Sequence, residues 1–114
     1  LKDFVEALKA TKAQLQDGTM WLMQNGMTNF DNAGAASHDY LNLFGITALT
    51  YMWTLQAKAA LAGAASSDGS DPYFDTKLAT GRYFLARWVP DAAAHLAKLK
   101  TGAGPVMALS AEAF

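Results

Sequence analysis

The middle of the chain carries a long apolar run at helical spacing that no charged side chain interrupts. Charges are absent between Asp39 and Lys58, and the run contains no proline. Two sides of a helix are apolar in it: one holds Leu41, Phe44, Ala48, Tyr51 and Leu55, and the other holds Leu43, Ile46, Leu49, Met52 and Trp53. Because a helix that is apolar on most of its circumference needs partners on several sides, we expect this segment to be the central helix of a bundle.

The residues before this run predict a first helix over residues 2–25. Its apolar stripe advances by four and three residues and consists of Phe4, Leu8, Thr11, Leu15, Gly18 and Leu22. Glycine costs about 1 kcal/mol of helix propensity relative to alanine. The place of Gly18 on the stripe therefore indicates close approach of a neighbouring helix, with a break in the helix as the alternative. Gly26 is expected to end the helix in the left-handed conformation.

A second helix is expected from about residue 29 to residue 62. Thr28 is its predicted N-cap and Gly63 its predicted end. The small residues at 32–37 leave a kink or a short turn open as an alternative. Residues 64–71 are small and polar with a glycine, and they predict an interhelix linker because they have little to bury.

The pattern after the linker predicts a third helix over residues 72–101. Asp71 followed by Pro72 is typical of an N-cap and a first helical residue. The apolar stripe keeps its phase across Pro90, so we expect one continuous helix that is kinked there. Its members are Phe74, Leu78, Gly81, Leu85, Trp88, Ala92, Leu96 and Leu99. Gly102 should close this helix, and a tail over residues 103–114 follows, in which Met107, Leu109 and Phe114 can pack back on the bundle.

These elements predict an all-α fold: an up-down-up antiparallel bundle of three long helices, the third kinked at Pro90. The 114 residues are enough for one domain, and we expect residues 1–114 to form a single helical-bundle domain.

Composition indicates that part of the surface of this domain is covered by something else. Charged residues make up 17% of the chain, against about 25% in a typical soluble domain. A larger parent chain or an oligomer would supply that cover. Leu1 stands where an intact reading frame would place methionine, which favours a fragment of a longer protein.

Charge and cysteine content narrow the function classes. The net charge is −1 and no segment is strongly basic, so a nucleic-acid partner is not expected. The absence of cysteine excludes disulfides and thiolate metal sites and fits a reducing compartment such as the cytoplasm. Residues 40–57 are near the lower length limit for a membrane span, but their polar residues favour a buried core helix.

The candidate catalytic and metal-binding residues are few. Asp91 and His95 are spaced i, i+4 and could form an ion pair or share a metal ion, but the sequence offers no third ligand for a metal. Neighbouring residues of a helix point in different directions, so Ser37-His38-Asp39 is not expected to act as a triad. Gly102-Ala103-Gly104 lacks the preceding strand and the third glycine of a dinucleotide loop, and helix capping explains it.

Five large side chains could contact a partner. Arg82 and Arg87 could each hold a carboxylate or a phosphate, although solvated or interface arginines are the commoner case. Trp21, Trp53 and Trp88 are expected to be core or interface anchors rather than part of a cofactor site.

The order and spacing of several segments resemble one known domain. The segments are Tyr40 to Gly45, the alanine-rich helix up to Gly63, Tyr73 to Phe84, Val89-Pro90, and Leu109 to Phe114. Together they are similar to the extra C-terminal helical domain of a group of bacterial acyl-CoA dehydrogenases, which includes enzymes like 3-methylmercaptopropionyl-CoA dehydrogenase.

This resemblance implies an architectural role within an enzyme that uses FAD to dehydrogenate an acyl-CoA thioester. The flavin site and the catalytic glutamate of such enzymes lie before this domain. We therefore assign no catalytic, cofactor-binding or metal residue here, and neither Glu6 nor Glu112 resembles the base.

The expected partner is the remainder of the dehydrogenase chain, with a homo-oligomer also open. The alternative is a stand-alone helical interaction module; a small heme or metal bundle would need inward ligands that the sequence lacks. Whether Arg82 or Arg87 touches coenzyme A stays open.

Overall fold

The computed structural model describes all residues from Leu1 to Phe114, and the only regular elements in it are helices. The elements are α1 (Lys2–Asn25), α2 (Phe30–Ser66), α3 (Tyr73–Arg87), α4 (Asp91–Leu99) and the short 3-10 helix η1 (Ala111–Ala113). The predicted all-α class is therefore confirmed.

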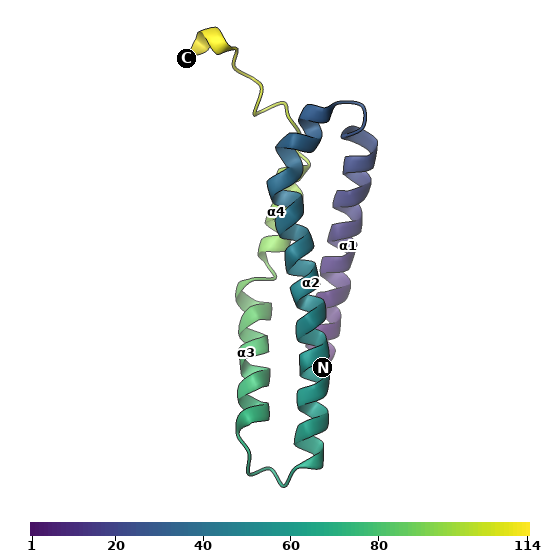
Figure 1. Cartoon of the computed structure of the whole chain (residues 1–114), viewed down its shortest axis with the longest axis vertical. Coiled ribbons are helices and arrows are strands. Elements are labelled where there is room, and N and C mark those ends of the chain that lie inside the picture. Colours follow the sequence, from purple (N-terminus) through teal and green to yellow (C-terminus); the bar gives the residue numbers. More distant parts are fainter.

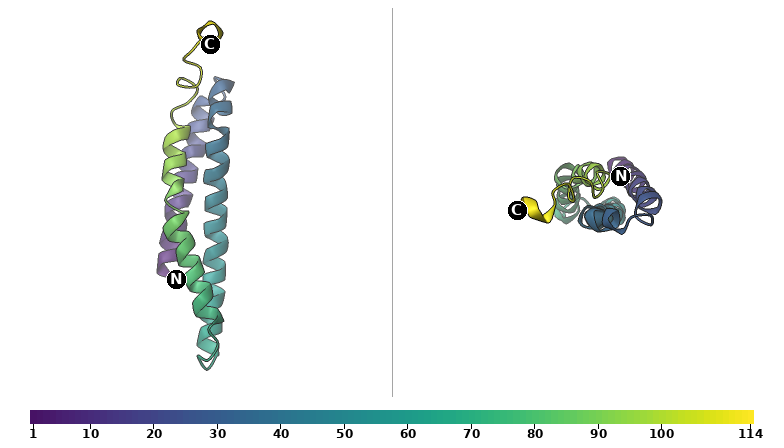
Figure 2. Two further views of the ribbon diagram at one scale, coloured as in Figure 1. Left: turned by 90° about the vertical axis from the view of Figure 1, so that its left-hand side faces the viewer. Right: turned by 90° about the horizontal axis from the view of Figure 1, so that it is seen from above.

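Helix α2 is the element that the other helices pack on. Helices α1 and α2 run side by side in opposite directions, and the chain returns along α2 through α3 and then α4 (Figure 1). The views in Figure 2 show an elongated and thin arrangement, and the Cα atoms span 69 × 28 × 14 Å. A chain this thin has little interior, and 18 of its 114 residues are buried.

The connection between α1 and α2 differs from the prediction at both of its capping residues. Gly26 is right-handed, with φ −78°, and its N–H donates to the Leu22 carbonyl, so the first helix does not end in a left-handed cap. The N-cap of α2 is Asn29, whose side chain accepts from the N–H of Asp31 at 3.0 Å. The hydroxyl of Thr28 instead donates to the Asn25 carbonyl. Since Thr28 already serves the end of α1, it is not available to cap α2.

Helix α2 is longer and more regular than predicted. It passes through residues 32–37 without a turn and continues past Gly63 to Ser66, so the linker begins at residue 67 and not at residue 64. Gly63 is an interior residue that faces the ring of Phe74, and a Cβ at this position would collide with that ring. The glycine marks a close approach between α2 and α3 and not the end of a helix.

The predicted third helix is divided into α3 and α4 by a turn at residues 88–90. The N–H groups of Trp88 and Val89 both donate to the Phe84 carbonyl, at 2.9 and 3.3 Å, and Pro90 has no N–H to continue the ladder. The prediction of one kinked helix is therefore wrong, although the inward stripe resumes at Ala92. Helix α3 begins at Tyr73 with Pro72 as its N-cap, one residue later than predicted, although the Asp71 carboxylate does accept from the N–H of Tyr73 at 2.9 Å.

Two clusters of buried side chains lie along the inner side of α2. The first joins α2 to α4 and consists of Ala36, Leu43, Ile46, Ala92 and Leu99. The second joins α1, α2 and α3 and consists of Phe4, Ala57, Ala60 and Leu78. Gly18 packs against Leu43 and Leu99, where an added Cβ would lie 3.2 Å from each side chain, which confirms the predicted close approach at Gly18.

Threonine hydroxyls link α2 to α1 at close range. The hydroxyl of buried Thr47 lies 2.9 Å from the carbonyl of Leu43 in its own helix and 3.2 Å from the carbonyl of Thr11 in α1. Thr54 repeats this arrangement with Thr50 and, at 3.4 Å, with Phe4. Such short polar side chains satisfy themselves on the helix backbone and still let two helices approach closely.

The two apolar sides predicted for the second helix do not both face the core. Leu41, Phe44, Tyr51 and Leu55 are between 43% and 70% exposed, so the first predicted side is wrong as a core face. Leu49 and Met52, on the second side, are exposed as well, while Leu43 and Ile46 are buried. Phe84 in α3 is buried, whereas Trp88, in the turn after α3, is exposed. The positions that do face inward on α2 are largely alanine and threonine, because α1, α3 and α4 pack too close for large side chains.

The C-terminal segment also departs from its prediction. Residues 103–114 lead away from the bundle and do not pack back on it (Figure 1). Met107, Leu109 and Phe114 are more than 60% exposed.

The identity of the inward face of α2 can be tested by a matched pair of leucine truncations. Leu43→Ala should lower the free energy of unfolding by about 2–5 kcal/mol, because Leu43 is fully buried. Leu41→Ala, at a 70% exposed position, should change it by less than about 0.5 kcal/mol. Half-buried Leu85 contacts the second cluster, and Leu85→Ala should cost near the lower end, about 2 kcal/mol. Urea unfolding followed by circular dichroism measures all three. Equal losses at positions 41 and 43 would show that the inward face is misassigned.

Candidate functional site

The most prominent surface feature is an uncharged apolar strip along the solvent side of α2. We call it the outer face of α2, and it consists of Leu41, Ala48, Leu49, Tyr51, Met52 and Leu55. These residues recur on the side of the helix opposite Leu43, Thr50 and Ala57, which face the core. The five large ones are 43–70% exposed, so they offer about 500 Å² of mainly apolar surface, which lies within the range of the largest patch on a typical monomer, and such patches are often functional.

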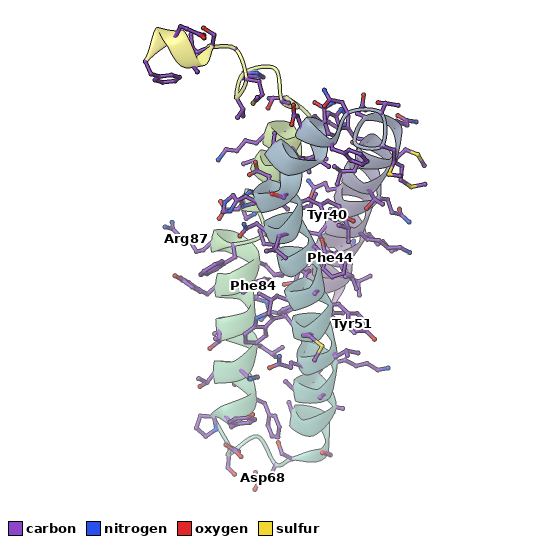
Figure 3. All side chains as sticks on the ribbon, turned by 45° about the horizontal axis from the view of Figure 1, so that its top comes forward. Tyr40, Phe44, Tyr51, Asp68, Phe84 and Arg87 are labelled. Carbon is purple, nitrogen blue, oxygen red and sulfur yellow. The ribbon has the colours of Figure 1, made fainter.

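Next to this face, an apolar groove runs between α1 and α2 toward the end where they connect. We call it the α1–α2 groove; its two adjoining hollows have volumes of about 430 and 330 Å³. The side chains that line it include Leu15, Gln16, Thr19, Met20, Met23, Met27, Phe30, Tyr40 and Phe44. Figure 3 shows Tyr40, Phe44 and Tyr51 following one another along α2.

One hydrogen bond fixes the floor of this groove. The hydroxyls of Thr19 and Tyr40 lie 2.7 Å apart, and both side chains line both hollows. Tyr40 also makes an edge contact with Phe44, with ring centroids 6.5 Å apart. The groove is therefore a preformed hollow held by α1 and α2 together. Sequence analysis did not identify three residues that line the groove: Met20, Met23 and Met27. Their spacing of three and four residues places them on one side of a helix, and this signal could have revealed them.

His95 makes two contacts that the sequence did not predict, one with Asp39 and one with His38. His95 Nδ1 lies 2.8 Å from Asp39 Oδ1, and both side chains are 16% exposed. The His38 ring makes an edge contact with the ring of His95, with centroids 6.2 Å apart. Asp91 makes no ion pair with His95, so that predicted pairing is wrong. Asp39 lies on α2 and His95 lies on α4, so their contact joins the two helices. His95 pairs with Asp39 and not with Asp91, one turn away in its own helix, because Asp39 faces α4 directly.

This histidine cluster has no metal-site or triad geometry. No group of three or more His, Cys, Asp or Glu side chains is placed to hold a metal ion. The hydroxyl of Ser37 donates to the Gly34 carbonyl at 2.8 Å, on an exposed part of α2. Ser37 therefore does not meet the Asp39–His95 pair, and the cluster serves to hold α4 against α2.

The two arginines singled out from the sequence lie in different settings. Arg82 Nε donates to Asp3 Oδ2 at 3.0 Å, and its guanidinium carbon lies 6.0 Å from the centre of the Phe4 ring. This contact ties α3 to the start of α1. Arg87 is exposed, takes part in none of the ion pairs and extends away from α2 (Figure 3).

The tryptophans divide between core and surface. Trp53 stacks on Phe84 with centroids 6.3 Å apart, and Trp21 packs against the first buried cluster. Trp88 is 52% exposed at the turn between α3 and α4. Gly102 has φ +68° and lies next to the Trp21 ring, where the helical region ends. The segment Gly102-Ala103-Gly104 therefore caps the C-terminal end of that region.

Both glutamates of the chain lie at its surface. Glu6 is exposed and lies 3.8 Å from Lys2, and Glu112 is exposed in η1. No helix combines the length and the hydropathy that crossing a membrane requires.

The chain matches the model of a known protein family. A family model described as acetyl-CoA dehydrogenase C-terminal like matches residues 1–110. The match therefore includes all four α-helices, the outer face of α2 and the α1–α2 groove. No curated protein sequence matches the chain.

The Asp3–Arg82 contact can be tested by titration. Partial burial acts to raise the pKa of Asp3, but the hydrogen bonds from Arg82 and from the N–H of Phe4 and the charge of Arg82 hold it below its usual value. Arg82→Ala should raise the pKa of Asp3, measured by NMR of its carboxyl carbon.

The sign for stability follows from the direction of this shift. A depressed carboxyl pKa adds stability above the unfolded-state value, and that stability is lost as the pH falls through the folded-state value. Both side chains are about half exposed, so the effect should stay below about 1 kcal/mol. Arg87→Ala is the matched control and should leave the pKa of Asp3 unchanged; an equal shift in both variants would contradict the assignment.

Proposed function

Because the chain belongs to the acetyl-CoA dehydrogenase C-terminal-like family, we propose that it is the accessory C-terminal domain of an FAD-dependent acyl-CoA dehydrogenase. The parent enzyme carries out α,β-dehydrogenation of an acyl-CoA thioester, and this domain contributes packing and assembly. The segments quoted above, from Tyr40 to Gly45 and from Tyr73 to Phe84, favour the 3-methylmercaptopropionyl-CoA dehydrogenase group. We place the enzyme in the cytoplasm, in keeping with a chain that has no cysteine.

The observation that carries this proposal is the outer face of α2. A 37-residue helix that packs α1, α3 and α4 on one side still presents large apolar residues on the other. The chain exposes 7364 Å², about 1,300 Å² more than the roughly 6,100 Å² expected of a compact monomer of its mass. We propose that the dehydrogenase body covers the outer face, which is uncharged because it lies inside the assembled enzyme.

Catalysis then rests with the parent and not with this domain. The Asp39–His95 pair holds two helices together, and neither glutamate lies in a pocket. Arg87, exposed and unpaired, is free to meet an acidic group of the body or a phosphate of coenzyme A, whereas Arg82 is already engaged by Asp3.

Docking through the outer face can be tested by adding a charge to it. Met52→Asp should weaken binding of the chain to the separately produced dehydrogenase body at least tenfold, because the carboxylate would be buried without a partner. Ala94→Asp, on an exposed position of α4, is the control and should leave the affinity unchanged. Isothermal titration calorimetry measures both. Wild-type affinity in the Met52→Asp variant would count against this docking surface.

The division of roles can be tested with the flavin itself. The purified 114-residue chain should be colourless and should not bind added FAD, whereas the dehydrogenase body should show the visible absorbance of a bound flavin. Stoichiometric flavin in the isolated chain would overturn the assignment. The alternative, a stand-alone interaction module, is favoured if the coding sequence upstream of Leu1 holds no dehydrogenase.

A further inference from the structure

The C-terminal segment is an apolar arm that the bundle holds away from itself. We call residues 103–114 the C-terminal arm. Its base is fixed, because Gly102 adopts φ +68° and the N–H of buried Ala103 donates to the Asn32 side chain at 2.9 Å. A further bond, from the N–H of Met107 to the Ala103 carbonyl, shapes the first turn of the arm. The direction in which the arm leaves is therefore set by contacts with the folded domain.

Beyond this base, the arm presents its large apolar side chains to solvent. Val106, Met107 and Leu109 are 62–69% exposed, and Phe114 is 93% exposed. Glu112 is the only charged side chain of the arm. Apolar residues at this density are expected to be covered by a partner surface when the protein is assembled.

The α1–α2 groove has the size and the polarity to receive such an arm. From Leu15 to Met27, the groove follows about 18 Å of α1, and the eight residues from Met107 to Phe114 reach up to about 28 Å when extended. The groove is lined mainly by methionine, leucine and aromatic side chains. Methionine adapts its shape to a bound apolar segment more readily than other side chains.

The arm of the same molecule is poorly placed to enter this groove. The Asn32 side chain accepts from the N–H of Ala103 and donates to the Asn25 carbonyl at the end of α1, and the arm leaves this point in the direction away from α1 (Figure 2). The arm and α1 lie on opposite sides of the bundle when it is viewed along its length (Figure 2). The arm of a second molecule can approach the groove from solvent.

We propose that two copies of this chain exchange their C-terminal arms, each arm filling the α1–α2 groove of the other copy. A standard stable interface totals about 1,600 Å², and a single short arm in a single groove would leave the contact one-sided. Reciprocal exchange doubles the area and closes the assembly with two-fold symmetry.

Charge supports the same pairing. Lys12 lies one helical turn before Gln16 and on the side of α1 that lines the groove, and it takes part in none of the ion pairs. Glu112 follows Leu109 by three residues on the arm. An arm that places Leu109 beside Met20 and runs toward the start of α1 points Glu112 toward Lys12 of the second copy.

Sedimentation velocity on the 114-residue chain tests the exchange. The wild-type chain should associate to a dimer, and Leu109→Asp should weaken association at least tenfold, as should Met23→Asp in the groove. Leu109→Asp leaves the bundle intact because the arm is outside it, so loss of folding cannot explain its effect. Ala94→Asp is the control and should dimerise like wild type. A wild-type chain that stays monomeric at all concentrations, or a Leu109→Asp variant that dimerises normally, would overturn the proposal.

Charge reversal and cross-linking identify the arm and the groove as the contact. Glu112→Lys and Lys12→Glu should each weaken the dimer, and the double variant should recover most of the loss; no recovery would contradict the pairing. The natural chain has no cysteine, so Leu109→Cys chains can be mixed with differently tagged Met23→Cys chains. A disulfide between the two tags should form in excess over the control mixture of Leu109→Cys with Ala79→Cys. Equal yields in both mixtures would count against exchange.

This inference is independent of docking on a dehydrogenase body. The arm-exchange variants at positions 12, 23, 109 and 112 leave the outer face of α2 untouched, and Met52→Asp leaves the arm untouched. Loss of body binding with an intact dimer, and loss of the dimer with intact body binding, are therefore separate results.

Discussion

The close packing of α1 against α2 is the constraint on which the rest of the structure depends. Thr47 and Thr54 bring α2 within hydrogen-bond distance of the α1 backbone, and Gly18 lets the side chains of Leu43 and Leu99 lie directly against α1. With α1 this close, the inner side of α2 has room for alanine and threonine but for few large residues. Two small buried clusters form there instead of one large core.

The surface follows from this constraint. A helix whose small residues face inward must present its large apolar residues elsewhere, and α2 presents them on its outer face and along the α1–α2 groove. The low content of charged residues and the large exposed area fit together, because both are expected of a domain whose apolar surface is covered by other parts of an assembled protein. The chain belongs to a family of dehydrogenase C-terminal domains, and we propose that the dehydrogenase body covers the outer face of α2. We propose that the C-terminal arm of a second copy covers the α1–α2 groove.

Polar contacts between helices fix the position of the segment that follows α3. Pro90 ends the backbone ladder of α3, and the chain re-enters a helix that is held to α2 by the Asp39–His95 pair and to α1 by the ion pair of Lys100 with Asp17. Asn32 then fixes the base of the arm. These contacts join residues that are 56 to 83 positions apart in the sequence. Local periodicity carries no information about pairs at such separations.

The sequence by itself determined the helices and their class, because apolar spacing, Asp71-Pro72 and the stripe through Phe4, Gly18 and Leu22 are local signals of helix and cap. It also indicated that the surface is covered, through low charge content, and it indicated the family through the order of its segments. Only the tertiary structure decided which side of α2 is inside, because Leu41 and Leu43 are equally apolar and the choice depends on how close α1, α3 and α4 approach. The same holds for the partner of His95, the break at Pro90 and the outward path of the arm, each of which is set by contacts between distant residues rather than by the preference of any one of them.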